Sequence, residues 1–260
     1  GSLPSLQQLE DPKSNLATEI ISEDGIVLGK YFFENRTKVE FDEIPDNLIN
    51  ALIATEDIRF KNHSGIDVRA LFRAILGAVK GDVSSGGAST ITQQLAKMLF
   101  TEKPASGMQR VLQKLKEWVI SVQLEKRYTK NEILTMYLNR FDWVNNAVGI
   151  ESASKVYFNK EPINLEIEES AMLVGMLKNP SLYNPNRRIE LTTSRRDVVL
   201  HQMKKYKFIT DSTYKKSIEK EIVLDFKQAS HNRGLAPYFR EYLRTEMKKW
   251  CSQNKKADGK

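Results

Sequence analysis

The sequence is poor in cysteine and has no long apolar run. Cys251 is the only cysteine among 260 residues, so no disulfide can form within the chain, and the redox compartment stays open. No stretch reaches the ~18 consecutive apolar residues that a membrane-spanning helix needs. Internal repeats and low-complexity tracts are also missing. These absences exclude an intramolecular disulfide framework, a transmembrane helix and a repeat array.

Acidic residues are fewer than basic ones, 33 against 40, which gives a formal net charge of +7. This balance indicates an anionic partner such as a phospholipid surface, a pyrophosphate or a nucleic acid. Interleaved aromatic and basic residues, which are typical of nucleic-acid platforms, are missing, so we expect no nucleic acid. With 40% apolar residues the chain can bury the core of one large domain or one and a half.

Residues 86–97, GGASTITQQLAK, contain no carboxylate. The run combines two glycines, hydroxyls, paired amides and Lys97 at a predicted junction of loop and helix, which suits an anionic, oxygen-rich ligand. Upstream, residues 56–67 read EDIRFKNHSGID and contain the acid-base groups that the first run lacks. The two segments together predict a site.

The pattern predicts a mainly helical chain after a short extended opening. Asp24-Gly25 between β-prone runs predicts a hairpin. Apolar residues at intervals of three and four predict a helix from Pro45 to about Ile58, which puts Glu56 near its C-terminus. Two capping boxes and further apolar periodicity predict later helices. These are expected at 90–100, 109–128, 129–139, 167–178 and 192–206.

The helix expected from Gln109 has two unlike sides. An apolar stripe lies opposite a polar side that holds one carboxylate among cations. On composition alone this polar side is a solvated face with ion pairs worth a few tenths of a kcal/mol each. The other interpretation is one wall of a binding site. The stripe is Val111, Leu112, Leu115, Trp118, Val119 and Val122, and the polar side is Arg110, Gln113, Lys114, Glu117 and Ser121.

Five segments carry a family resemblance, from about Ile44 to Met203. They are Glu56-Asp57 with Phe60, His63, Gly65 and Asp67; residues 86–94 followed by Lys97; Lys114-Leu115-Lys116-Glu117; residues 130–134 with Tyr137-Leu138-Asn139; and Arg195-Arg196 through Met203. In this order they closely resemble the peptidoglycan glycosyltransferase family. That family is the lysozyme-like module of class A penicillin-binding proteins and of monofunctional transglycosylases.

The resemblance implies a mainly α, lysozyme-like, two-lobed helical fold with a short N-terminal β-hairpin. We expect a tag remnant and extended segment at 1–43, the glycosyltransferase domain at 44–225 and a linker toward a removed transpeptidase domain at 226–260. The expected location is the outer face of the bacterial cytoplasmic membrane, with the native anchor removed. Expected partners are lipid II, the growing lipid-linked glycan, the membrane surface and a cell-wall synthesis complex.

The implied reaction polymerises lipid II into β-1,4-linked glycan, with inversion at the donor anomeric carbon and release of undecaprenyl pyrophosphate. Such a transfer needs a base for the incoming hydroxyl and cations for the leaving pyrophosphate. By resemblance, Glu56 is that general base, and Glu117 is a second essential carboxylate that orients cations or acceptor. Without the rest of the motif, Glu56-Asp57 would be interpreted as an exposed acidic end of a helix.

The remaining site residues also follow from the resemblance. Phe60 is expected either under the cleft or in the ordinary core. His63 is expected to be a metal ligand, a second acid or a group that makes a structural hydrogen bond. Gln93 is expected either to bind substrate or to face the core. Gln113 stands where the family often has arginine, and Met98 where it often has asparagine. The expected substrate-binding set is Asp57, Phe60, His63, Gly87, Ser89, Thr90, Gln93, Gln94, Lys97, Arg110, Lys114 and Lys116.

Several points stay open at this level. Residues 71–79 form either a membrane-facing apolar jaw or ordinary core. Asp57, Asp67 and Glu117 could attract Mg²⁺ or Mn²⁺ around a pyrophosphate, although no dedicated ligand spacing is visible. The fourth and fifth segments read as scaffold. Two other functions compete with the transferase, namely a lysozyme-like hydrolase or lytic enzyme and a non-catalytic module that binds anionic glycolipid.

Overall fold

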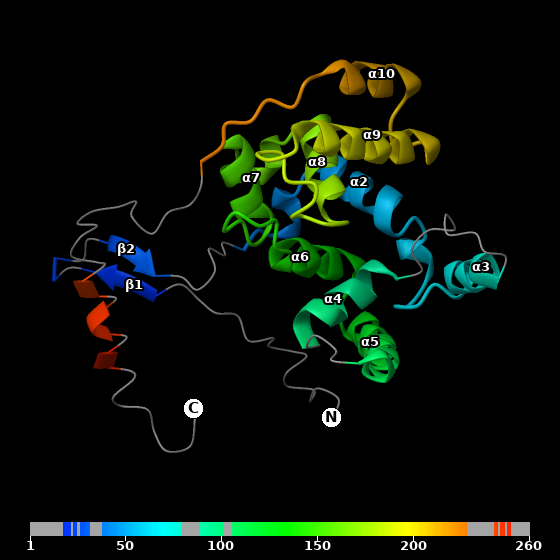
Figure 1. Ribbon diagram of the computed structural model, residues 1–260, viewed down its shortest axis with the longest axis horizontal. Coiled ribbons are helices and arrows are strands. Elements are labelled where there is room, and N and C mark those ends of the chain that lie inside the picture. Colours follow the sequence, from blue (N-terminus) through cyan, green and yellow to red (C-terminus); the bar gives the residue numbers. More distant parts are fainter. Residues whose placement is uncertain are drawn as a thin grey trace.

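The computed structural model describes residues 38–79, 89–100 and 106–227, with short pieces at 18–21, 23–24, 27–31 and within 242–250. These parts are mainly helical, as the sequence predicts (Figure 1). Strands β1 (Thr18–Ile21) and β2 (Val27–Tyr31) pair antiparallel on either side of the expected hairpin turn. Gly25 of that turn lies outside the described residues.

The helices follow one another with short connections. They are α2 (Asp46–Glu56), α3 (Val68–Val79), α4 (Ile91–Phe100), α5 (Gly107–Arg127), α6 (Lys130–Arg140), α7 (Ile150–Phe158), α8 (Ile167–Met176), α9 (Ile189–Lys205) and α10 (Asp211–Glu219). Among the residues that are described, none of these helices combines the length and the apolar character needed to cross a membrane.

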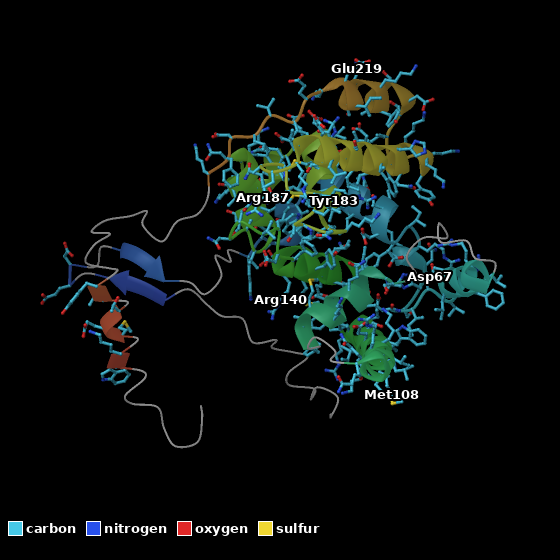
Figure 2. The ribbon with its side chains drawn as sticks, viewed as in Figure 1. Asp67, Met108, Arg140, Tyr183, Arg187 and Glu219 are labelled. Atoms are coloured by element: carbon cyan, nitrogen blue, oxygen red, sulfur yellow. The ribbon has the colours of Figure 1, made fainter. Side chains whose placement is uncertain are left out.

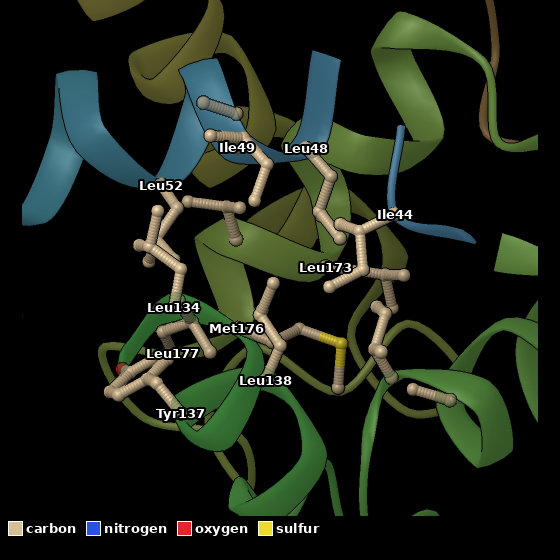
Figure 3. Close-up of a cluster of buried hydrophobic side chains, with 14 of the residues drawn as sticks. Ile44, Leu48, Ile49, Leu52, Leu134, Tyr137, Leu138, Leu173, Met176 and Leu177 are labelled. Atoms are coloured by element: carbon tan, nitrogen blue, oxygen red, sulfur yellow. The ribbon is translucent and has the colours of Figure 1, made fainter. Parts of the chain in front are cut away.

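The core lies where α2, α6 and α8 meet, with α9 packed against α8 and α2 (Figures 1 and 3). Helix α8 is the central element because seven consecutive residues, from Ser170 to Met176, are buried. Leu52 of α2, Leu138 of α6 and Leu173 of α8 are fully buried in this cluster. The core therefore fixes the ends of α2 and α6 relative to each other.

Two of the predicted helix starts are visible in atomic detail. Thr129 and Glu132 form the expected reciprocal capping box at the start of α6. At the start of α4, the Thr90 hydroxyl accepts the Gln93 N–H at 3.1 Å, so Thr90 caps the helix. The Gln93 side chain donates to the carbonyl oxygen of Gly65 at 3.3 Å, so it points toward another segment.

The sequence analysis did not identify α7 or α10. Gly149 is the N-cap of α7, and its φ of +84° and its close approach to the Asn139 carbonyl (3.0 Å from a Cβ placed there) require glycine. Helix α10 is mostly polar and has no continuous apolar stripe. The segment at its end is held by Arg196 of α9, which is 1% exposed and donates to the carbonyls of Lys220 at 2.6 Å and Ile218 at 3.2 Å. This contact supports the scaffold role expected for the fifth segment.

Helix α5 buries part of its polar side. Glu117 is 4% exposed and Ser121 is fully buried, so for these two residues the interpretation as a solvated face is wrong. Four of the six stripe residues are exposed to solvent, while Trp118 and Val122 are half-buried. Figure 2 shows Met108, which lies near the start of this helix. The physical reason is that α5 packs against α4, while Lys114 and Ser121 on its polar side contact Ser89 and Gly65. Its exposed apolar residues are Met108, Val111, Leu112, Leu115 and Val119.

Candidate active site

Gly65 is the point where α4, α5 and the segment after α2 converge. Its φ is +93°, and a Cβ there would lie 2.8 Å from the backbone carbon and oxygen of Ser121 on α5. Its carbonyl oxygen accepts the Thr90 hydroxyl at 2.7 Å as well as the Gln93 amide. Only glycine permits this approach, so Gly65 sets how close the first two motifs come to α5.

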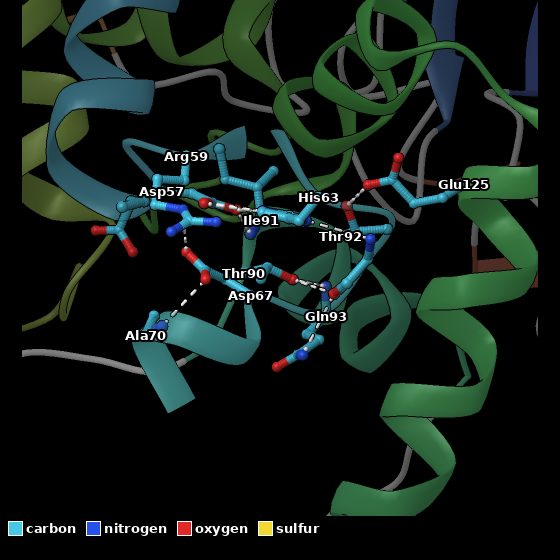
Figure 4. A network of polar contacts seen from close by, with 12 residues as sticks. Asp57, Arg59, His63, Asp67, Ala70, Thr90, Ile91, Thr92, Gln93 and Glu125 are labelled. Carbon is cyan, nitrogen blue, oxygen red and sulfur yellow. Dashed lines mark hydrogen bonds and ion pairs between the residues drawn. The ribbon is translucent and has the colours of Figure 1, made fainter. Parts of the chain in front are cut away.

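Asp57 joins α2 to the start of α4 (Figure 4). One carboxylate oxygen accepts the Ile91 N–H at 3.1 Å, and both oxygens lie 3.0 Å from Nε2 of His63. On the other side of the ring, Nδ1 accepts the Gly65 N–H at 3.2 Å. Since Nδ1 accepts, the proton sits on Nε2 and is donated to Asp57. Both ring nitrogens of His63 are therefore bonded within the protein.

A second buried group lies beneath this cluster. Glu125 accepts the Thr92 hydroxyl at 2.6 Å and pairs with Lys130 at 2.7 Å. The Lys130 ammonium also donates to the His63 carbonyl at 2.6 Å and lies 4.3 Å from the ring centroid of Phe60. Phe60 is fully buried. These contacts place Phe60 in the core under the loop that carries His63.

A cleft of about 1140 Å³ opens between α4, α5 and the end of α8. Most of its polar lining comes from the second and third motifs. It also includes Lys178, which the sequence analysis missed because only the position of the helix end brings that residue to the cleft. The lining residues are Ser89, Gln93, Gln94, Lys97, Met98, Arg110, Val111, Gln113, Lys114, Leu115, Glu117, Trp118, Phe141, Leu177 and Lys178.

The α5 wall of the cleft is organised around Glu117. One oxygen of this buried carboxylate accepts from the Lys114 ammonium at 3.1 Å, and the other accepts from the Gln113 amide at 3.2 Å. Lys114 also donates to the Ser89 hydroxyl at 2.8 Å and so links α5 to the segment before α4. Glu117 thus holds a half-exposed cation at the cleft surface.

Glu56 approaches the cleft from the C-terminus of α2. Gln94 lines the cleft and donates its Nε2 to Glu56 Oε2 at 2.8 Å. Glu56 is half-buried and is not among the lining residues. The single carboxylate proposed as a base is therefore joined to the cleft through the amide of Gln94.

The structure divides the predicted substrate-binding residues. Six of them line the cleft, while Asp57, Phe60, His63 and Thr90 belong to the buried cluster beside it. Lys116 is on α5 but does not line the cleft, and Gly87 lies outside the described residues. The six that line the cleft are Ser89, Gln93, Gln94, Lys97, Arg110 and Lys114, and Glu117, the second predicted catalytic residue, lines it as well.

The carboxylates considered for a divalent cation are already bonded. Asp57 accepts from Ile91 and His63, Glu117 from Lys114 and Gln113, and Asp67 pairs with Arg59 at 3.3 Å while accepting the Ala70 N–H. Within the ranges that the structure describes, no group of three or more His, Cys, Asp and Glu side chains could hold a metal ion. These residues do not form a dedicated cation site.

Comparison with known proteins identifies the class. A family model described as transglycosylase matches residues 24–204. Penicillin-binding protein 1A of Pseudomonas aeruginosa is 36% identical over 247 residues, 95% of this chain and 29% of the relative. Penicillin-binding protein 1A of Escherichia coli is 35% identical over 257 residues, 99% of this chain and 30% of the relative. A crystal structure of Penicillin-binding protein 1A from Haemophilus influenzae covers 95% of this chain and 26% of its own, at 21% identity and a TM-score of 0.49.

The family match and the two sequence relatives agree. The chain belongs to the transglycosylase family. It spans less than a third of the length of these curated relatives.

Proposed function

We propose that this chain polymerises lipid II into β-1,4-linked glycan. Glu56 takes the proton from the 4-hydroxyl of the acceptor sugar, and that oxygen attacks C1 of the lipid-linked glycan. The C1–O bond to the pyrophosphate breaks with inversion, and the lipid pyrophosphate leaves with the electron pair. The observation that carries the proposal is the hydrogen bond from Gln94, which lines the cleft, to Glu56. On the α5 wall of the same cleft, Lys114 is paired with Glu117.

The cations that line the cleft suit the leaving group. A departing pyrophosphate gains negative charge as the C1–O bond lengthens, so fixed cations stabilise the transition state more than the ground state. We assign this role to Lys97, Arg110 and Lys114, which all line the cleft. Glu117 orients Lys114, and Ser89 and Gln94 bind phosphate or sugar oxygens.

The substrate is a lipid, so we place the cleft at a membrane surface on the outer side of the cytoplasmic membrane. Exposed apolar side chains on α3 and on α5 support this placement, because lone apolar residues are common but a row of them on a helix is not. The domain limits and the partner complex expected from the sequence remain predictions. On α3 the exposed apolar residues are Val68, Phe72 and Leu76, and on α5 they are Met108, Val111, Leu112, Leu115 and Val119.

The test is incubation with labelled lipid II, with and without EDTA. Wild-type protein should produce long glycan, Glu56→Gln should lose at least about 1000-fold in rate, and Lys97→Ala about 100-fold. Glu190→Gln, an exposed change on α9, is the matched control and should keep full activity. Digestion of preformed cell wall without polymer formation would favour the hydrolase, and substrate binding without turnover would favour the non-catalytic module.

A further inference from the structure

Three side chains from three helices form a chain that ends at Glu56. The Tyr137 hydroxyl of α6 donates to Gln94 Oε1 of α4 at 3.0 Å. Gln94 Nε2 then donates to Oε2 of Glu56, the last residue of α2, at 2.8 Å. Among the described residues, no hydrogen bond is made to the other oxygen, Glu56 Oε1. This series of hydrogen bonds therefore engages Oε2 of Glu56 and leaves Oε1 for another partner.

Tyr137 is well suited to anchor this chain because it cannot move and does not ionise. Its side chain is fully buried in the cluster formed by α2, α6 and α8 (Figure 3). Burial, with a smaller contribution from the charge of Glu56, raises the pKa of the Tyr137 hydroxyl well above its usual range. The hydroxyl therefore keeps its proton and stays a donor wherever the enzyme works.

Gln94 needs such an anchor because the two ends of an amide are nearly equal in size but opposite in hydrogen bonding. With the Nε2 end toward Glu56 it donates to the carboxylate, whereas with the Oε1 end toward Glu56 it would face it with a second acceptor. Gln94 also has several rotatable side-chain bonds and lines the cleft, so packing alone does not fix its amide. A fixed donor at Oε1 holds both its position and its orientation.

We infer that Tyr137 is a positioning residue for the transfer reaction and acts through Gln94. By fixing the Gln94 amide it holds Glu56 Oε2, so that Oε1 faces the acceptor hydroxyl. This inference rests on the proposed function of Glu56 as the general base. It goes beyond the scaffold role expected for the segment around Tyr137, because a purely structural tyrosine would act on stability and not on the carboxylate.

The direct test is the side-chain ¹H–¹⁵N spectrum of Gln94 in the folded chain, assigned by the loss of its signals in Gln94→Met. The two Nε2 protons of wild-type Gln94 should be well separated, because one of them is donated to Glu56. In Tyr137→Phe the separation should collapse to that of a solvated glutamine. Tyr157→Phe is the matched control, since Tyr157 is also buried and donates to the Trp143 carbonyl at 2.7 Å, outside the cleft.

The second readout is steady-state kinetics with lipid II. Tyr137→Phe should lower kcat by about 10 to 100-fold with KM changed less than about threefold, because the base is misplaced while the binding groups stay. Tyr157→Phe should keep the wild-type kcat. In a double-mutant cycle, Tyr137→Phe should add no further loss to Gln94→Met, since both act on one path.

The outcomes separate the two proposals. A wild-type protein that makes no glycan would refute the proposed function, while the Gln94 spectrum still decides whether Tyr137 orients the Gln94 amide toward Glu56. An unchanged Gln94 spectrum in Tyr137→Phe, or losses that add in the cycle, would overturn the positioning role. If Tyr137→Phe does not fold, Gln94→Met alone decides, because wild-type kcat in that variant contradicts any action through Gln94.

Discussion

The cluster around Gly65 and the α5 wall of the cleft differ in how their polar groups are used. In the first, Asp57, His63 and Thr90 are buried and bonded to protein partners on every side that the structure describes. In the second, Lys114 is held by one carboxylate and still presents part of its surface to the cleft. The first region comes from the first two motifs, and the second comes from the third motif.

This difference shows that a motif residue can act in one of two ways. It can hold the helices together, or it can contact the substrate. Changes in the Gly65 cluster should cost stability first, because buried donors would lose their acceptors. Changes on the α5 wall should cost activity first, because a half-exposed cation contributes little to folding. The following variants test this division, in order of decreasing effect.

Gly65→Ala should be the most damaging. The positive φ and the 2.8 Å approach to Ser121 leave no room for a methyl group, so we expect a loss of about 3 kcal/mol or more in the free energy of unfolding. Chemical denaturation measures it. Gly107→Ala is the control, because nothing lies within 4 Å of a Cβ there. A stable but inactive Gly65→Ala would move Gly65 to the substrate-contact group.

Lys114→Met should lower the rate of glycan formation by about 100-fold, or about 2.7 kcal/mol of transition-state stabilisation, while the protein stays folded. The measurement is initial rate with lipid II beside the thermal midpoint. Lys116→Met is the control on the same helix, since Lys116 does not line the cleft. Equal losses in the two variants would show that the cleft geometry does not distinguish these lysines.

Thr90→Val keeps the side-chain shape but removes the donor to Gly65 and the cap of α4. We expect a loss of about 1–2 kcal/mol in unfolding free energy. Thr135→Val is the matched control, because its hydroxyl only donates to the Asn131 carbonyl within α6 at 2.9 Å. If Thr90→Val instead raised KM without loss of stability, Thr90 would be a substrate contact.

The smallest effect concerns the α6 cap and pH. Hydrogen bonds from the backbone N–H and then the hydroxyl of Thr129 lower the pKa of Glu132 from 4.5. A lowered folded-state pKa stabilises the fold above the unfolded value and loses this stabilisation as pH falls through the folded value. Glu132→Ala should therefore cost about a few tenths of a kcal/mol at pH 7, because the group is nearly fully solvated, and less below pH ~4. Glu219→Ala, at the exposed end of α10, should show no such pH dependence; a cost that persists at low pH would contradict the assignment.

Local signals predicted much of the fold. Thr129 with Glu132 placed the start of α6 correctly, and the apolar spacing placed α2, α5, α8 and α9, because caps and periodicity act over a few residues. Helices α7 and α10 were missed because one starts at a glycine and the other has no apolar stripe. Their positions depend on distant contacts such as Arg196 with the carbonyl of Lys220.

The candidate site was predicted as a set of residues but not as an arrangement. The residue types alone predict the hydrogen-bonding groups of residues 86–97 and the acidic groups of residues 56–67. The residue types do not show whether a group faces the cleft or the protein interior. Thr90 and Ser89 are neighbours, but the Thr90 hydroxyl is bonded to the Gly65 carbonyl, whereas Ser89 accepts from Lys114 and lines the cleft. Nor could any local pattern join Tyr137 to Glu56, which are 81 residues apart in the sequence.

The sequence by itself determined the helical class, the helix caps, the family and the groups available for chemistry, since these follow from short-range pattern and residue type. Only the tertiary structure decided which side of α5 is buried, that Gly65 meets the backbone of Ser121, and that Tyr137 and Gln94 lead to Glu56. The physical reason is that burial and hydrogen-bond partners are properties of packed helices far apart along the chain, and packing can reverse the side that amphipathicity favours.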